Sequence, residues 1–160
     1  MKKSELQLSR SLIEEISSFT TSDIVKIQDE VVLRYVAKFS KSPASRKRAV
    51  FELVRMESAE VLEYVARTAV SDETRKLAIK GLSKLSELES LKRLANSGDE
   101  KIVPQACAGL FRNLQKIVRE LDTESLELLS KFSKKGRHRK EALKWLKKLL
   151  VVKMIKKIEA

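Results

Sequence analysis

One eight-residue pattern occurs four times along the chain. Its copies are Arg46–Leu53, Arg75–Leu82, Val103–Leu110 and Arg139–Leu146, and they start 29, 28 and 36 residues apart. Each copy has Ala at its fourth position, a small or branched apolar residue at its fifth and Leu at its eighth. Steps of three and four residues place these side chains on one stripe of an α-helix. Self-similarity at such a period is typical of stacked helical repeats, so the pattern predicts an all-α fold.

Composition agrees with this interpretation. Of the 160 residues, 42% are hydrophobic and 35% charged, with only four Gly and two Pro, which favours stable helices over disorder or an all-β fold. No apolar run approaches the roughly 18 residues of a membrane span, and the first residues lack the apolar core of a secretory signal. The single Cys107 cannot form an internal disulfide, so we expect a reducing, cytoplasmic location.

Periodicity and capping residues predict where the helices lie. They are expected over about 4–20, 22–39, 43–56, 59–69, 72–86, 88–95, 104–121 and 123–132, with a last helical segment after Lys135-Gly136. Short connections make consecutive helices antiparallel neighbours. The expected pairs are 23–56, 59–86, 87–118 and 123–150, within one domain that has an N-terminal capping helix at 1–22 and a C-terminal cap at 151–160.

The repeated segments resemble the HEAT-repeat family. The segments Ser71–Leu82 and Gly98–Leu110 are similar to that family's Asp, then Val-Arg, then Ala and Leu at the start of its second helix. The resemblance covers about residues 23–150. It implies an α-solenoid of stacked antiparallel helical hairpins, with the second helices lining the binding side. Armadillo-type or irregular helical repeats are the alternative.

The same resemblance assigns a structural role to the first position of the pattern. HEAT-like repeats commonly use Arg there to bind Asp of the adjacent repeat. It therefore implies that Arg46, Arg75 and Arg139 support the stack through Asp72 or Asp99.

Positions two and six of the pattern share one helix face with position ten, the second residue after each copy ends, and this face lies away from the Ala and Leu stripe. Nine of these twelve residues are basic and none is acidic, although Lys and Arg make up only 34 of the 160 residues. Stacking would turn them into one cationic strip, the basic ladder. Its members are Lys47, Arg55, Lys76, Lys80, Lys84, Arg112, Lys140, Lys144 and Lys148.

Three interpretations of the basic ladder are open. Cations repeated about every 10 Å from helix to helix suit a polyanion, such as a nucleic-acid backbone held by charge. An acidic protein segment is a second partner of this kind. The ladder can also be a solvated face that serves solubility. Aromatic side chains near it are few, which disfavours a single-strand binder that works by stacking.

Charge is concentrated at the C-terminal end. The chain carries a net charge of +12, of which +9 lies in residues 134–160. A basic edge, Lys134, Lys135, Arg137 and Arg139, joins the last two helices and is either a phosphate-contacting or a solvated turn. His138 has no Cys or His partner at metal-ligand spacing, so we expect a solvent histidine there and no metal site.

The last helix changes phase near its end. Up to Leu150 its apolar residues form one arc, but Val151, Met154, Ile155 and Ile158 fall on the formerly basic side. We therefore expect a break near Leu150–Val151, after which these four residues cover the open end of the stack. The alternative is a contact with a second copy or another partner. The phase change disfavours binding along a membrane surface.

No catalytic constellation is present in the sequence. We find no Gly-rich phosphate loop, metal-ligand cluster or nucleophile with a base, and Cys107 lies on the apolar stripe, where a buried inert thiol is expected. Gly81 and Gly109 share one pattern position, which indicates a close helix contact. We expect a scaffold without cofactors rather than an enzyme. The alternatives are a protein–protein adaptor with apolar, C-terminal contacts and, remotely, a glycosylase similar to the HEAT-like DNA-alkylation-repair family.

Overall fold

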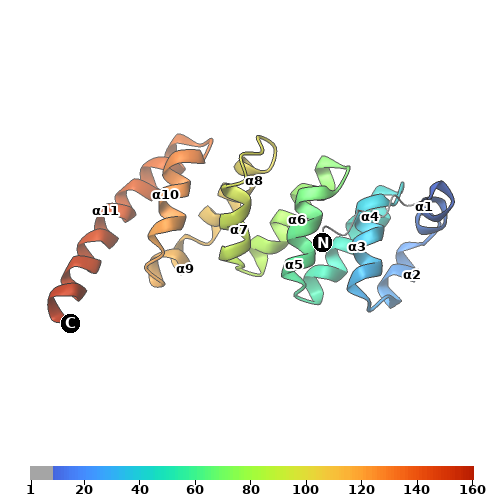
Figure 1. The fold of residues 1–160 in the computed structure, drawn as a ribbon, viewed down its shortest axis with the longest axis horizontal. Helices are drawn as coiled ribbons and strands as arrows, with labels where there is room; N and C mark the ends of the chain where they lie inside the picture. The colour runs from blue at the N-terminus through green and yellow to red at the C-terminus, as the bar shows by residue number, and fades with distance from the viewer. Residues whose placement is uncertain (1–8) are drawn as a thin grey trace, which may run out of the picture.

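The computed structural model describes residues 9–160, and these residues form helices and no strands. Figure 1 shows the helices following one another along the long axis, with α1 at one end and α11 at the other. The helices are α1 (Arg10–Ser17), α2 (Thr21–Lys26), α3 (Glu30–Phe39), α4 (Pro43–Arg55), α5 (Ala59–Thr68), α6 (Asp72–Lys84), α7 (Leu88–Ala95), α8 (Val103–Arg112), α9 (Leu114–Arg119), α10 (Thr123–Phe132) and α11 (Gly136–Glu159). The predicted all-α class is confirmed.

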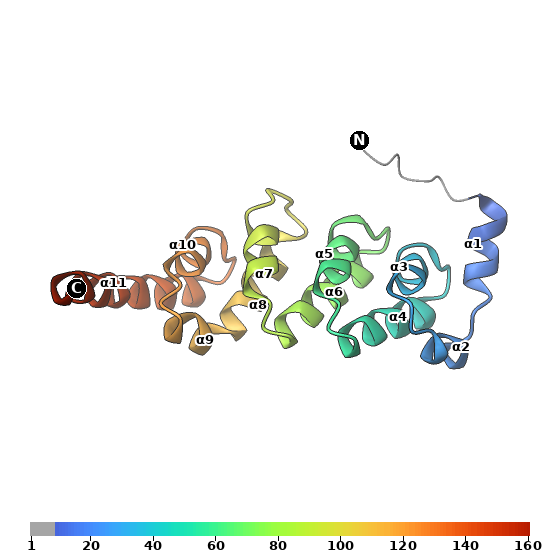
Figure 2. The same ribbon diagram turned by 60° about the horizontal axis from the view of Figure 1, so that its bottom comes forward.

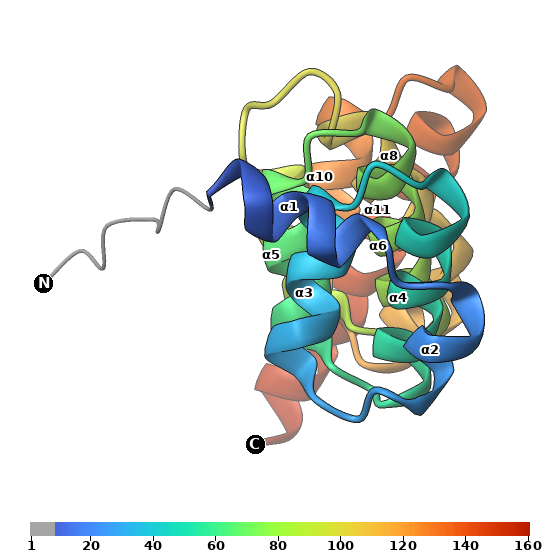
Figure 3. The same ribbon diagram turned by 90° about the vertical axis from the view of Figure 1, so that its right-hand side faces the viewer.

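Consecutive helices pack in pairs. The most extensive contacts join α3 to α4, α5 to α6, α7 to α8 and α10 to α11. Neighbouring pairs also touch: α4 packs on α6 and α6 on α8, while α3 packs on α5 and α5 on α7. Figures 2 and 3 show the result as two layers, with α3 and α5 in one and α4, α6 and α8 in the other. Apolar side chains from Ile16 to Leu149 form one buried cluster between the helices.

Polar caps fix where several helices begin. The hydroxyl of Ser42 accepts a hydrogen bond from the Ser45 backbone N–H ahead of Pro43, and Ser71 caps α6 in the same way through Thr74. A cap satisfies one of the backbone donors that a helix start leaves without an intrahelical partner. These helices therefore begin where the sequence predicts.

Two predicted helices are divided. The helix expected over 22–39 is α2 and α3, because Asp29 accepts hydrogen bonds from the backbone N–H groups of Val31 and Val32 and starts a new helix. The helix expected over 104–121 is α8 and α9, separated at Asn113. The Asn113 amide donates to the carbonyls of Gly109 (2.9 Å) and Ser83 (3.0 Å), so it competes for backbone groups at the break. Of the helix expected over 4–20, residues 4–8 lie outside the described part.

The break expected near Leu150–Val151 does not occur. Helix α11 runs uninterrupted from Gly136 to Glu159, and the prediction was wrong. No Gly or Pro follows Gly136, so nothing in the backbone favours a kink. Lys153 takes the place of an apolar residue on the side toward α10, and its long side chain reaches the Thr123 hydroxyl, which lies 3.1 Å from Nζ.

The two glycines at the seventh pattern position, Gly81 and Gly109, lie at close helix contacts. A Cβ atom added to Gly81 would lie 2.5 Å from Cγ2 of Val54 on α4. One added to Gly109 would lie 3.0 Å from Leu91 and 3.4 Å from Ser83 on α6. Glycine therefore lets α6 approach α4, and α8 approach α6, as the sequence predicts.

The arginines at the first pattern position do not bind the expected aspartates. Arg46, Arg75 and Arg139 each donate to a carbonyl six residues earlier, that of Ser40 (2.7 Å), Ala69 (2.6 Å) and Ser133 (2.6 Å). Each carbonyl belongs to the residue that caps the preceding helix.

The connection length explains this correction. Three residues separate the two helices of each of these pairs, which brings the last carbonyl within reach of the guanidinium. Asp72 is instead bound by Lys101 at 2.9 Å, and Asp99 accepts from the backbone N–H groups of Lys101 and Ile102 in its own turn. The arginines thus hold the two helices of a pair together, and Arg46 also donates through Nε to the Thr74 hydroxyl of the next pair at 3.2 Å.

Candidate functional site

All nine residues of the basic ladder are exposed, as a binding surface requires. They lie on α4, α6, α8 and α11. The predicted face is thus oriented away from the core on every helix that carries it. Whether the residues act together depends on how those four helices lie relative to one another.

The structure brings three ladder residues together between α6 and α8. Lys80 and Lys84 of α6 and Arg112 of α8 line one surface depression with Ser83 and Asn113. No carboxylate is among these lining residues. Asn113 fixes the geometry, because its amide hydrogen bonds join the end of α8 to the Ser83 carbonyl of α6. Sequence reasoning missed Asn113, although an Asn shortly after a glycine within an expected helix is a signal for a helix end.

A second depression lies toward the other ends of α6 and α8. Lys76 lines it together with Arg75, Gln105 and Lys134, so the basic edge meets the ladder here. Its remaining lining includes Asp72 and Glu100, and Asp72 is engaged by Lys101. A hydrogen bond from Lys101 outweighs the opposing effect of burial and lowers the pKa of Asp72. The cationic character is therefore stronger in the depression lined by Lys80, Lys84 and Arg112 than in this second one.

On α4, the ladder residue Arg55 is partly neutralised. Its Nε lies 2.7 Å from a carboxylate oxygen of Glu52, which is fully buried and also pairs with Arg48 at 2.8 Å. Glu52 was not singled out in the sequence, although it occupies the pattern position held elsewhere by Gly81 and Gly109. Within residues 9–160, none of the other eight ladder residues has an acidic side chain within 4 Å.

The fourth rung of the ladder is displaced from the other three. Helix α11 packs mainly on α10, whereas α4, α6 and α8 pack on one another in series. The extra helix α9 accounts for the longer sequence spacing before the last copy of the pattern. Lys140, Lys144 and Lys148 therefore lie on a helix that packs less extensively on α8 than α6 does, although its first turn reaches Phe111 of α8 through His138. The expected series of four equivalent helices does not extend to α11.

His138 is not a solvent histidine. Its ring stacks on that of Phe111 with centroids 3.6 Å apart and planes 10° apart, which joins the start of α11 to α8. Burial, with the nearby charges of Lys135 and Arg137, lowers the pKa of His138, so its neutral form is favoured. The prediction failed because the partner of His138 lies on another helix, and the spacing of residues along one helix does not reveal such a partner.

Within the basic edge, Arg139 differs from the other three residues. Lys134, Lys135, Arg137 and Arg139 are all exposed. Arg139 nonetheless uses Nη1 to bind the carbonyls of Ser133 and Lys134 at 2.6 and 3.1 Å, so its position is fixed by the turn. The other three are the members that extend toward solvent.

Charge differs between the two layers. Taken together, helices α3, α5, α7 and α10 carry six acidic and six basic residues, whereas α4, α6, α8, α9 and α11 each carry a basic excess. In the balanced layer the charges pair across helices, as in the contact of Arg93 with Glu63 at 2.8 Å. Burial opposes ionisation of Glu63, but hydrogen bonds from Arg93 and Arg67 outweigh it and lower its pKa. Glu63 is thus engaged with arginines away from the basic ladder.

Two kinds of candidate group for chemistry are metal-ligating side chains and the single thiol. No group of three or more His, Cys, Asp or Glu side chains within residues 9–160 is arranged to hold a metal ion. Cys107 is buried, and burial raises the pKa of its thiol to about 11, which disfavours the thiolate. The predicted burial of Cys107 is confirmed.

No helix among residues 9–160 is both long enough and apolar enough to cross a membrane. The predicted contact residues are exposed, with relative solvent accessibilities of 54–80%; they are Val151, Met154, Ile155 and Ile158. Comparison with protein-family models, with curated proteins and with solved structures found no match.

Proposed function

We propose that the chain is a HEAT-like α-solenoid that binds the backbone of a nucleic acid without catalysing a reaction. The surface concerned is the part of the basic ladder on α4, α6 and α8, together with Lys134. The observation that carries the proposal is the depression between α6 and α8, which is lined by Lys80, Lys84 and Arg112 and by no carboxylate. Cations that gather in a depression favour a phosphate backbone more than the same charges dispersed on a convex surface do.

The ordered pairing of α3 with α4, α5 with α6 and α7 with α8 supports the solenoid interpretation. Contacts between pairs recur at nearly constant sequence spacing. Ser58 binds Glu30, Arg93 binds Glu63 and Lys116 binds the carbonyl of Ser86. Such recurring contacts between neighbours are what stabilise a stack of repeats.

The surface suits charge recognition without base reading. Apart from Arg55, its cations have no carboxylate partner within residues 9–160 and are available for phosphates. The Phe111 ring is already stacked on His138, so it is not available for a base. Affinity should therefore depend weakly on sequence and steeply on salt.

The test is binding of a fluorescein-labelled DNA duplex by fluorescence anisotropy over a range of salt concentrations. The variant K80E/K84E should bind the duplex weakly. For K80A/K84A, the plot of the logarithm of the binding constant against the logarithm of the salt concentration should be less steep than that of the wild type by about two, because each lost phosphate contact removes roughly 0.9 from the slope. The matched control K26E/K131E changes the net charge equally at exposed sites on α2 and α10. Equal loss in both glutamate variants would show that net charge, not this surface, is responsible. Binding of polyglutamate in preference to DNA would favour an acidic protein segment instead.

A further inference from the structure

One row of exposed side chains runs the length of α11. Its members follow one another by alternating steps of four and three residues, which is the period of a coiled-coil seam. All six are exposed. We call this row the α11 seam, and it consists of Lys140, Lys144, Lys147, Val151, Met154 and Ile158.

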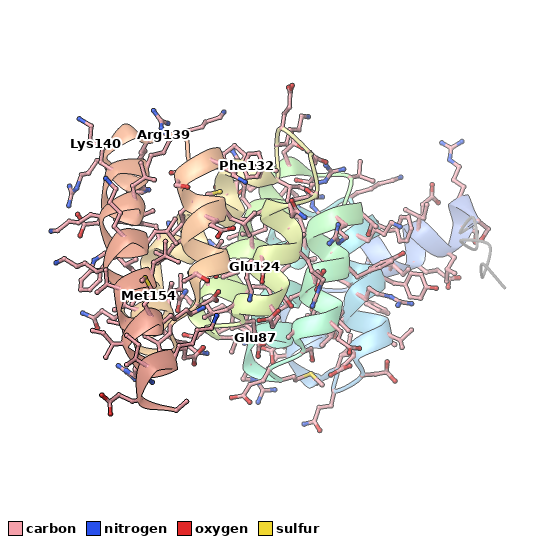
Figure 4. The ribbon with its side chains drawn as sticks, turned by 60° about the vertical axis from the view of Figure 1, so that its left-hand side comes forward. Glu87, Glu124, Phe132, Arg139, Lys140 and Met154 are labelled. Carbon is pink, nitrogen blue, oxygen red and sulfur yellow. The ribbon has the colours of Figure 1, made fainter. Side chains whose placement is uncertain are left out.

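The α11 seam faces away from the rest of the molecule. The opposite side of the helix contacts α10 through the buried residues Ala142 and Leu149. At about 100° per residue, the seam lies roughly 180° around the helix from them. Figure 1 places α11 at the end of the molecule, and Figure 4 shows Lys140 near one end of this helix and Met154 farther along it. No helix of residues 9–160 therefore covers the seam.

The two halves of the α11 seam differ in chemistry. The first half is cationic, and its three lysines have no acidic side chain of residues 9–160 within 4 Å. The second half is apolar, and Val151, Met154 and Ile158 are 55%, 65% and 80% exposed. Aliphatic side chains aligned on one helix face form a surface that favours burial against a partner.

We propose that the α11 seam binds an amphipathic helix of a partner protein. The seam of this helix would carry carboxylates in one half, opposite Lys140, Lys144 and Lys147, and apolar residues in the other half, opposite Val151, Met154 and Ile158. Charge complementarity selects the first half of the partner, and removal of apolar surface from water supplies affinity in the second. This surface is distinct from the depression between α6 and α8.

A second copy of this chain does not have the required chemistry. Parallel pairing of two seams places lysines opposite lysines, and antiparallel pairing places lysines opposite Val151, Met154 and Ile158. Neither arrangement supplies carboxylates along the seam. A bilayer is also a poor fit, because the three lysines lie in the centre of the exposed face rather than along its flanks.

The experiment uses the full chain and synthetic helical peptides about 20 residues long, which span the seam. Peptide A has Glu at three successive seam positions and Leu at the next three. Peptide B has the same composition, with Glu and Leu alternating along the seam. Fluorescence anisotropy should show that A binds at least about tenfold more tightly than B, because only A matches both halves at once.

Variants assign the two halves separately. Met154→Gln with Ile158→Gln should weaken binding of peptide A by about tenfold or more. Val25→Gln with Val31→Gln, which are exposed residues of α2 and α3, should leave it unchanged. Replacing Lys140, Lys144 and Lys147 by Glu should abolish binding of peptide A. The same variant should instead bind a peptide in which the Glu residues of A are changed to Lys.

Four results would overturn this inference. They are equal binding of A and B, absence of binding by A, an anionic phospholipid vesicle as the only binder, and a dimer in sedimentation equilibrium that M154Q/I158Q dissociates. The outcome is separable from that of the proposed function, because K80E/K84E should lose duplex DNA but keep peptide A. The M154Q/I158Q variant should do the reverse.

Discussion

Gly81 tests whether glycine is required for the approach of α6 to α4. In an ordinary helix interior, Gly→Ala stabilises by about 0.5–1 kcal/mol, because Ala loses less backbone entropy on folding. At Gly81, however, the new methyl group would lie 2.5 Å from Cγ2 of Val54. Val54 is β-branched and restricted to few rotamers on a helix, so the two helices must move apart.

The magnitude follows from these two opposing effects. Overpacking of a close contact costs about 1–3 kcal/mol, which exceeds the gain in propensity. We therefore expect Gly81→Ala to lower the free energy of unfolding by about 1–2 kcal/mol. For a chain of this length the melting temperature should fall by about 2–4 °C per kcal/mol.

Gly109→Ala is the matched comparison. Its nearest obstacle is Cδ2 of Leu91 at 3.0 Å, the far end of a flexible side chain that can yield. Its free energy of unfolding should stay within about 0.5 kcal/mol of the wild type, since the two effects nearly cancel. Urea denaturation followed by circular dichroism measures both variants.

A double-mutant cycle isolates the contact. Val54→Ala removes the methyl groups that oppose the new Cβ, so G81A should cost less in the V54A background, by about 1 kcal/mol or more. If G81A were as stable as the wild type, or if G81A and G109A shifted stability equally, the inferred closeness of α4 and α6 would be refuted.

Three further predictions concern buried polar groups. Lys92 contacts Asp122, which caps α10, and Glu124 in its first turn, and replacing Lys92 by Met should lower the free energy of unfolding by about 2 kcal/mol. Burial disfavours the charge of Lys92, but hydrogen bonds to Glu89 and Glu124 raise its pKa, so this difference should persist from about pH 6 to 10 and fade only at higher pH. Because the pKa of His138 is lowered on folding, wild-type stability relative to His138→Phe should be constant above about pH 7.5 and fall as the pH drops toward 5, measured by urea denaturation; the opposite slope would contradict the stack with Phe111. Cys107 should react with a chromogenic disulfide only as fast as the protein opens. In the variant C107A/A44C, which removes Cys107 and introduces a cysteine at the exposed position 44, the thiol should react at once.

Local sequence signals were sufficient for the middle of the chain. Ser42-Pro43 and Ser71 cap α4 and α6 as predicted, because a cap depends on a hydroxyl and on backbone groups within three residues. The exposure of the ladder was also predictable, since a lysine or arginine on the face opposite an Ala and Leu stripe has no apolar core to enter.

Contacts between repeats were not predictable in the same way. The Asn113 amide divides α8 from α9 by binding Ser83, which is 30 residues away. His138 is partly covered because Phe111 of another helix lies opposite its ring. Arg75 binds the Ala69 carbonyl instead of an aspartate, because the connection between α5 and α6 is short. Each outcome depends on how two helices meet.

The sequence by itself determined where most of the helices lie, the stripe that each buries and the basic excess of the second helix of each pair, because periodicity and side-chain charge are local properties. Only the tertiary structure decided which charges gather. It brought Lys80 and Lys84 beside Arg112, and it neutralised part of Arg55 with the buried Glu52. It also packed α11 mainly on α10, with His138 of its first turn stacked on Phe111 of α8. The physical reason is that these relations depend on contacts between side chains from segments far apart in the sequence, and the residues of one helix do not specify such contacts.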